Sequence, residues 1–223
     1  VDRFANEARI MKSLGHDAIA RFFGQGAVRD PQTGIDVPWL AMTLGGANLR
    51  EFVKGWEFSL AEFKTIALDA IRAVENVHEQ QIIHRDIKPE NFVVNDINGS
   101  RRGMMIDFGI AKYIGEDVAH RPMDEFTQHA EFIGPQFFSS PELIAYARNK
   151  AQLVDHRSDL FQLGKVLWYL ATGVVSAGTI ARRRDPTGGA LHEILVELMH
   201  DDADDRTPQV ATELRATLDA LVA

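Results

Sequence analysis

The stretch IIHRDIKPENFVV, residues 82–94, places six charged or polar side chains within eight residues and flanks them with apolar residues. A solvated loop between two short strands would explain such a cluster without any chemistry. A catalytic loop would use it differently, because a carboxylate can accept a proton from a hydroxyl group and an amide oxygen can bind a hard cation. The residues able to do this chemistry are Asp86, Lys88 and Asn91.

A second acidic residue follows at a position where it could share a cation with Asn91. After Asn91 the sequence is typical of a strand (NFVV), a turn (INGSRRG) and a second strand (MMIDFG) that ends in Asp107. Such a hairpin would make Asn91 and Asp107 neighbours. Because Mg²⁺ prefers oxygen ligands, the pair is a candidate magnesium site, with Asp86 projecting toward whatever the metal holds.

The hydrophobic periodicity predicts the first elements around this loop. Residues 2–14 are predicted to form a helix that stops at Gly15, with Glu7 on or beside its apolar face. A carboxylate on the apolar face is costly unless it pairs with a cation. The alternative is that Glu7 lies at the edge of this face and its side chain reaches water. Two strand-like runs, AIARFFG and VPWLAM, follow, and the segment between them, with Gly24 and Gly26, is interpreted as a turn and not as a phosphate-binding loop.

Helices dominate from residue 59 onward. The first long one is predicted to begin with a capping box formed by Ser59 and Glu62, and the second to end at Gly173. A third is predicted near ALHEILVELMH. The last is predicted to begin with Thr207 as its cap and Pro208 in its first turn.

Composition excludes several classes of function. The chain of 223 residues has no cysteine, which excludes disulfides and thiolate metal ligands or nucleophiles. Its net charge of −8 disfavours nucleic acid and anionic membranes as partners, and its apolar runs are too short to span a bilayer. No signal peptide is recognisable, so a cytoplasmic location is expected. Because the sequence opens on Val1 and not on Met, we expect a piece of a longer chain.

The motifs HRDIKPEN and DFG together resemble the catalytic loop and the metal-binding motif of eukaryotic-type protein kinases. Further segments resemble that family. SSPE at 139–142 resembles its A-P-E segment, and HRSDLFQLGKVLW resembles the helix whose buried Asp, here Asp159, anchors the catalytic loop. FANEARIMKSLGH, at the start of the chain, resembles its regulatory helix. The resemblance covers essentially the whole chain. It implies an α+β, protein-kinase-like fold, with a remnant of the N-terminal lobe over residues 1–46 and a largely helical C-terminal lobe over residues 47–223.

The resemblance also implies catalytic roles. Asp86 would orient the substrate hydroxyl and accept its proton, and Lys88 would neutralise the γ-phosphate, as in serine/threonine kinases. Asn91 and Asp107 would hold Mg²⁺ ions that bridge the phosphates of ATP. An inward-facing Glu7 is explained as the acidic residue of the regulatory helix.

The segment MTLGG at 42–46 looks like the hinge that holds adenine. Backbone groups of Thr43 and Gly45 would then bond the base, Met42 would be the gatekeeper, and Val93 would pack beneath the base.

Structural and regulatory roles are implied as well. His84 is interpreted as a packed residue that supports Phe108, and Arg206 lies where the family pairs an Arg with the Glu of A-P-E, here Glu142. Glu90 is expected to be solvated or to pair with substrate.

Arg85 is interpreted as a switch that meets a phosphate on the activation loop. The predicted phosphorylation site is Thr127, or a neighbouring hydroxyl at Ser139 or Ser140.

The sequence departs from the family pattern in two ways that bear on activity. It contains neither the Gly-rich loop nor the strand Lys that precede the regulatory helix, and Pro135 stands where the activation segment usually has a Thr. The leading hypothesis is a serine/threonine protein kinase domain that uses ATP and Mg²⁺ on a protein substrate. The alternatives are a pseudokinase or interaction module and, third, a small-molecule phosphotransferase. Residues 1–223 alone are expected to bind Mg-ATP weakly and to self-associate.

Overall fold

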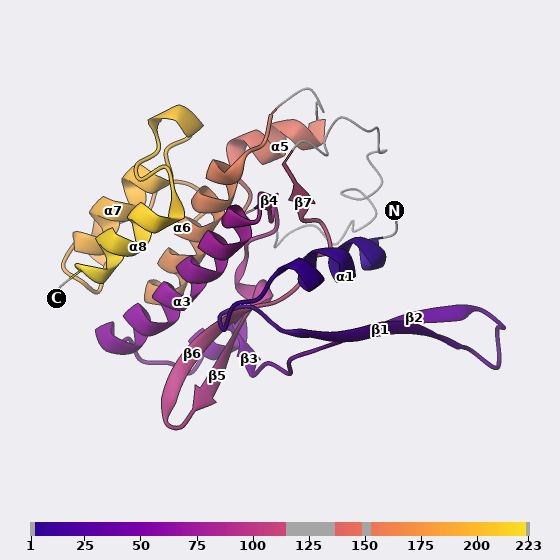
Figure 1. Ribbon diagram of the computed structural model, residues 1–223. Helices are drawn as coiled ribbons and strands as arrows, with labels where there is room; N and C mark the ends of the chain where they lie inside the picture. Colours follow the sequence, from indigo (N-terminus) through magenta and orange to yellow (C-terminus); the bar gives the residue numbers. More distant parts are fainter. Residues whose placement is uncertain (1–2, 115–136, 149–152, 222–223) are drawn as a thin grey trace.

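The computed structural model describes residues 3–114, 137–148 and 153–221 (Figure 1). Its helices are α1 (Arg3–Ser13), α2 (Leu49–Val53), α3 (Leu60–Glu79), α5 (Pro141–Arg148), α6 (His156–Thr172), α7 (Ala190–Leu198) and α8 (Ala211–Asp219). Its strands are β1 (Phe22–Arg29), β2 (Asp36–Met42), β3 (Ala47–Asn48), β4 (Ile82–Ile83), β5 (Phe92–Ile97), β6 (Ser100–Met105) and β7 (Lys112–Tyr113). Single 3₁₀ turns occupy Pro89–Asn91, Arg182–Arg184 and Ala203–Asp205.

Helix α6 lies at the centre of the helical body. Every residue from Ser158 to Ala171 is buried, as expected for a helix packed on all sides. Helices α3 and α7 pack against α6, and α8 packs against α3 (Figure 1). The predicted end of this helix is confirmed, because Gly173 takes the left-handed conformation and its N–H donates to the Tyr169 carbonyl.

After Ser158, which opens the buried segment of α6, three further polar residues follow at intervals of three: Asp159, Gln162 and Lys165. A buried polar group is costly unless it is hydrogen-bonded. Each of these residues therefore needs a hydrogen-bond partner, and the segment that supplies it is held in place by α6.

Strands β5 and β6 form the hairpin predicted after the candidate catalytic loop, and β3 extends the sheet on the β5 side. The turn is shorter than the predicted INGSRRG, because pairing continues to Ile97 and Ser100. Asn98 and Gly99 both have positive φ, the conformation of the tight two-residue turn that matches strand twist. Helix α3 covers β6, which fixes the hairpin against the body (Figure 1).

Strands β1 and β2 form a two-stranded arm that projects from the body (Figure 1). The predicted hairpin is confirmed, but the predicted turn at Gly24 and Gly26 is wrong, because both residues lie within β1. Trp39 of β2 lies across these glycines. A Cβ at Gly26 would come within 2.7 Å of the Trp39 ring, so a side chain there would displace the indole.

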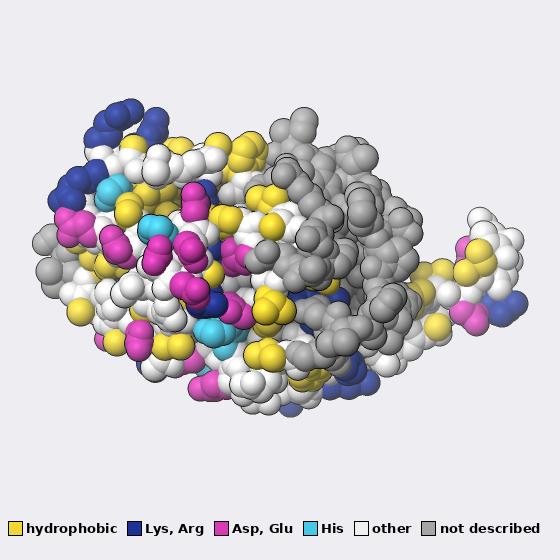
Figure 2. Space-filling view, turned by 90° about the horizontal axis from the view of Figure 1, so that it is seen from above, with side chains coloured by type: hydrophobic (Ala, Val, Ile, Leu, Met, Phe, Trp, Pro, Cys, Tyr) yellow, Lys and Arg dark blue, Asp and Glu magenta, His cyan; other side chains and the backbone are white. Residues whose placement is uncertain are grey.

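The arm is the most apolar exposed part of the described chain. Phe23, Val28, Val37 and Trp39 are all exposed. On the face seen from above, acidic side chains are spread among hydrophobic ones, and one group of basic side chains lies at the end opposite the arm (Figure 2). No helix in the described ranges is long and apolar enough to cross a bilayer.

Of the two predicted helix starts, the first is confirmed in position and the second is wrong. Ser59 is the N-cap of α3, but the predicted capping box is not formed: the Ser59 side chain makes no capping hydrogen bond, and Glu62 accepts from the Trp56 indole at 2.8 Å. Helix α8 begins at Ala211, after the segment that contains Thr207 and Pro208, and not within it. The predicted helices at α1 and α7 are confirmed.

Candidate active site

The loop between β4 and β5 brings together the three residues that the sequence analysis selected. The Lys88 ammonium lies 2.6 Å from Asp86 Oδ2, and Asn91 Nδ2 donates to the Asp86 carbonyl at 2.8 Å and to Oδ2 at 3.0 Å. The side chains of Asp86 and Lys88 are each 21% exposed, so the carboxylate is reached by solvent while it is held from two sides. Asp86 Oδ1 accepts no hydrogen bond from the described residues, which leaves one acceptor for a substrate.

Asp107 lies beside this loop, as the predicted hairpin requires. Phe92 pairs with Met105, and the Ile106 N–H donates to the Asn91 carbonyl at 2.8 Å. The aspartate follows β6 and is not its last residue; it takes a left-handed backbone conformation with φ of 63°. Non-glycine residues adopt this conformation only where their surroundings enforce it, and such positions cluster at functional sites.

The donor set of Asn91 and Asp107 fits Mg²⁺. Asn91 commits its Nδ2 to Asp86, so the oxygen Oδ1 is the group that remains for a ligand. An amide oxygen and a carboxylate are hard donors, and Mg²⁺ is commonly held by one or two such groups together with substrate phosphates. Within the described ranges no cluster of three or more His, Asp or Glu offers a complete protein cage for a metal.

Asp159 of α6 anchors the loop, as predicted. Its carboxylate is fully buried and accepts the N–H groups of His84 and Arg85, each at 2.8 Å. His78 Nε2 lies 2.9 Å from the same carboxylate. Burial raises the pKa of Asp159, but the hydrogen bonds from His78 and Arg85, together with the electrostatic interaction with the His78 and His84 rings, outweigh it and hold the pKa below its ordinary value.

Two further anchors were missed by the sequence analysis. Gln162, one turn after Asp159, accepts the Ile87 N–H with its Oε1 at 2.7 Å, so α6 holds the loop on both sides of Asp86. His78, at the end of α3, is the second. The available signal for Gln162 was its position: a polar residue three after Asp159 in an otherwise apolar helix needs a buried partner.

His84 supports Phe108, as predicted. Its imidazole is 1% exposed, and the two ring centroids are 5.0 Å apart. Burial lowers the pKa of His84, against the opposing charges of Asp159, Asp86 and Asp107. Nδ1 accepts the Asp86 N–H at 3.3 Å, so the ring also braces the residue beside it.

Glu7 faces inward, as expected of the acidic residue on the first helix. Its Oε1 accepts a hydrogen bond from the Phe108 N–H at 3.4 Å. This contact joins α1 to the DFG segment.

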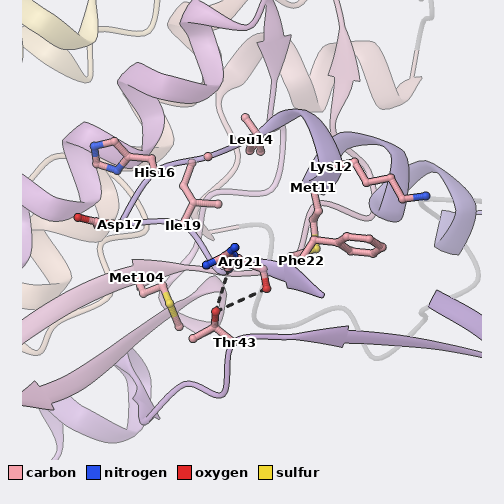
Figure 3. Close-up of a pocket in the computed structure, with 11 residues that line it drawn as sticks. Met11, Lys12, Leu14, His16, Asp17, Ile19, Arg21, Phe22, Thr43 and Met104 are labelled. Atoms are coloured by element: carbon pink, nitrogen blue, oxygen red, sulfur yellow. Dashed lines mark hydrogen bonds between the residues drawn. The ribbon is translucent and has the colours of Figure 1, made fainter. Parts of the chain in front are cut away.

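The Thr43 N–H is already used within the protein, because it donates to the Arg21 carbonyl at 2.9 Å, whereas the Thr43 carbonyl accepts no hydrogen bond from the described residues. The Arg21 N–H donates to Thr43 Oγ1 at 3.0 Å (Figure 3). Thr43 therefore contacts the residue that precedes β1, and it lines a cavity of about 620 Å³. Gly45 packs against Val93, where a Cβ would come within 2.5 Å of a Val93 methyl.

Arg85 is 3% exposed, with φ of 69° and its guanidinium 5.6 Å from the centre of the Tyr146 ring. Thr127 and Pro135 lie outside the described residues. The alternative phosphorylation site at Ser140 is wrong for this structure, because that hydroxyl is fully buried.

Ser140 Oγ lies 2.7 Å from Ser158 Oγ, which ties the SSPE segment to α6. Ser139 is partly buried. Glu90 is not simply solvated: its carboxylate pairs with Arg50 of α2.

The predicted pairing of Glu142 with Arg206 is confirmed. Arg206 is fully buried, and its two terminal nitrogens donate to the two Glu142 oxygens at 2.7 and 2.8 Å. The guanidinium also donates to the carbonyls of His200 and Arg157. This pair links α5 to the segment before α8.

Comparison with known proteins agrees with this geometry. The sequence matches the protein kinase domain family over residues 2–221. It is 35% identical to a probable serine/threonine-protein kinase of Corynebacterium efficiens over 77% of the chain and 24% of that protein. It is 31% identical to the serine/threonine-protein kinase PknB of Mycobacterium tuberculosis over 99% of the chain and 32% of that protein. The chain thus spans about a quarter to a third of the length of these relatives. It belongs to the protein kinase domain family.

Proposed function

We propose that the protein transfers the γ-phosphate of ATP to Ser or Thr hydroxyls of a protein substrate. The observation that carries the proposal is the Asp86 carboxylate, which is held by Lys88 and Asn91 through Oδ2 while Oδ1 accepts nothing from the described residues. The relatives named above are serine/threonine-protein kinases, which supports the same class of acceptor.

In this mechanism Asp86 Oδ1 accepts a hydrogen bond from the substrate hydroxyl, orients it and takes its proton. The hydroxyl oxygen bonds to the γ-phosphorus while the bond from that phosphorus to the bridging oxygen breaks, and ADP leaves. Lys88 is close enough to Asp86 to contact the transferred phosphoryl group and to stabilise charge on it. Asn91 and Asp107 would hold Mg²⁺, which when bound neutralises the phosphates. The anchors on α6 keep Asp86 in place, since positioning supplies most of the catalysis of phosphoryl transfer.

The segment after β2 is proposed to bond the base. Because the Thr43 N–H donates to the Arg21 carbonyl, the Thr43 carbonyl and the backbone groups of Gly45 are proposed to bond adenine, with Val93 beneath it.

The proposal extends to organisation and regulation. Residues 1–46 and 47–223 are proposed to belong to two lobes of a cytoplasmic kinase, and Arg85 to meet a phosphate on Thr127. Each of these assignments follows from the family pattern.

The test is Asp86→Asn in the complete protein, assayed with labelled ATP on casein and by nucleotide titration. We expect phosphotransfer to fall about 10²- to 10⁴-fold with nucleotide affinity nearly unchanged. Undetectable transfer by the parent protein, with nucleotide still bound, would favour the pseudokinase alternative. Equal turnover of parent and variant would remove Asp86 from the mechanism.

A further inference from the structure

A second cavity, of about 310 Å³, lies on the helical body between α5, α6, α7 and the loop that follows α6. Its size is at the lower end of the range for ligand pockets, about 300–1,000 Å³, which suits one or two side chains better than a nucleotide. None of the candidate catalytic residues lines it. Among its lining residues Phe137, Ile144 and Val196 are large apolar side chains that remain 37–40% exposed.

Lys165 lines the same cavity. It belongs to the buried stretch of α6 and is only 9% exposed. Its ammonium donates to the carbonyls of Ser176 at 3.1 Å and Gly178 at 3.5 Å, and it lies 5.5 Å from the centre of the Phe161 ring. No carboxylate of the described residues lies within ion-pair distance. The direct contacts of this buried cation are therefore with neutral dipoles and a ring.

The charge of the Lys165 ammonium is only partly compensated by its contacts. An ammonium has three donors, and the two carbonyls use two of them, one at the limit of hydrogen-bond distance. Burial lowers the pKa of Lys165, while the charge of Asp201 on the cavity wall acts in the opposite direction. Asp201 is exposed and makes no direct contact with the ammonium, so it compensates the charge only in part. A carboxylate that entered the cavity could supply the missing partner at short range.

We propose that this cavity binds a segment of a partner protein in which an Asp or Glu side chain lies next to a large apolar side chain. The carboxylate would bind Lys165 at the floor, and the apolar side chain would cover Phe137, Ile144 and Val196 at the rim. The apolar side chain would exclude water from the contact between the carboxylate and Lys165, as the residues around a binding hot spot do. A small inorganic anion would satisfy Lys165 but would leave the apolar rim uncovered. The site is separate from the Asp86 site, so the proposal does not depend on phosphotransfer.

The test measures peptide binding by fluorescence anisotropy, using the complete protein and short labelled peptides without Ser, Thr or Tyr. The peptides carry Glu-Phe, Gln-Phe or Glu-Ala at their centre. We expect Glu-Phe to bind at least about tenfold more tightly than Gln-Phe, since one charge-assisted hydrogen bond is replaced by a neutral one. Glu-Ala should also bind more weakly, because it leaves the rim uncovered.

Lys165→Met keeps most of the side-chain volume and should reduce the Glu-Phe to Gln-Phe ratio to about one. Lys54→Met is the matched control, because Lys54 is exposed, lies between α2 and α3 and does not line the cavity. This variant should leave the ratio unchanged. Val196→Arg changes an exposed rim residue and should weaken Glu-Phe binding even if Lys165→Met fails to fold. Asp86→Asn should not alter binding. Equal affinity for Glu-Phe and Gln-Phe in the parent protein, or an unchanged ratio in folded Lys165→Met, would overturn the proposal.

Discussion

Asp159→Asn is the substitution that most directly tests how the fold positions the catalytic loop. It keeps the shape of the side chain and removes its charge and one acceptor atom. In the structure Oδ2 accepts from His84 N and lies against His78 Nε2, while Oδ1 accepts from Arg85 N. An asparagine can replace only one of these oxygens. Its NH₂ group must therefore face at least one buried N–H donor.

The expected cost follows from these contacts. A buried donor without a partner costs about 1–3 kcal/mol, and each remaining bond to the neutral amide is weaker by about 1 kcal/mol than a bond to the carboxylate. Together these terms give a loss of about 3–5 kcal/mol in the free energy of unfolding. With an m-value of about 3 kcal/mol/M, the urea midpoint should fall by about 1–1.7 M. Phosphotransfer should fall as well, since a displacement of about 1 Å at the reacting group can cost about 100-fold.

The assay is urea unfolding followed by hydrogen exchange of the His84 and Arg85 amides. Asp36→Asn is the matched control, because Asp36 is an exposed member of a surface ion pair and its loss should cost less than about 1 kcal/mol. Since the folded-state pKa of Asp159 is lowered, its stabilisation is present above the unfolded pKa, near 3.8, and is lost as the pH falls through the folded value. A loss below about 1 kcal/mol with both amides still protected would refute the anchoring role.

Three further outcomes are expected. Lys88→Met should lower phosphotransfer about 10- to 100-fold while nucleotide affinity changes little, measured by steady-state kinetics and titration, because a charge-assisted contact of about 1.5–3 kcal/mol is lost. Glu142→Ala should lower the free energy of unfolding by about 3–5 kcal/mol, because it leaves the buried Arg206 guanidinium without its carboxylate partner. Adding Arg206→Leu removes that charge and should recover part of the loss. Burial lowers the pKa of His84, so below about pH 6.5 the unfolded state binds a proton that the folded state does not. The free energy of unfolding, measured by urea unfolding, should therefore fall by up to about 1.4 kcal/mol for each pH unit of acidification. His84→Gln should reduce this slope.

Features set by short-range sequence signals were predictable. The spacing of Asp86, Lys88 and Asn91 places all three on one loop, and the hairpin after Asn91 brings Asp107 alongside. Gly173 ends α6 because a left-handed residue satisfies the last carbonyls of a helix. In each case the distance along the chain is short, so local geometry leaves few alternatives.

Features that depend on packing between distant segments were not predictable from these signals. The burial of Ser140 depends on Ser158 of α6, and the use of the Thr43 N–H depends on its register against Arg21. A shift of one residue in a strand reverses the direction of every backbone group, so the sequence alone does not show which hinge groups are already hydrogen-bonded within the protein. Glu62 shows the same limit, since the distant Arg101 and the nearby Trp56 compete with the helix cap for its carboxylate.

The polar residues of α6 show how one helix can serve two surfaces. Residues three apart on an α-helix differ by about 300° in direction, so each step from Asp159 to Gln162 to Lys165 turns about 60° around the axis. The first two residues, Asp159 and Gln162, face the catalytic loop and hold it before and after Asp86. Lys165 lies about 120° from Asp159 and reaches the loop after the helix instead. Because α6 is buried along this whole stretch, a partner that binds at Lys165 would contact the same rigid element that positions Asp86.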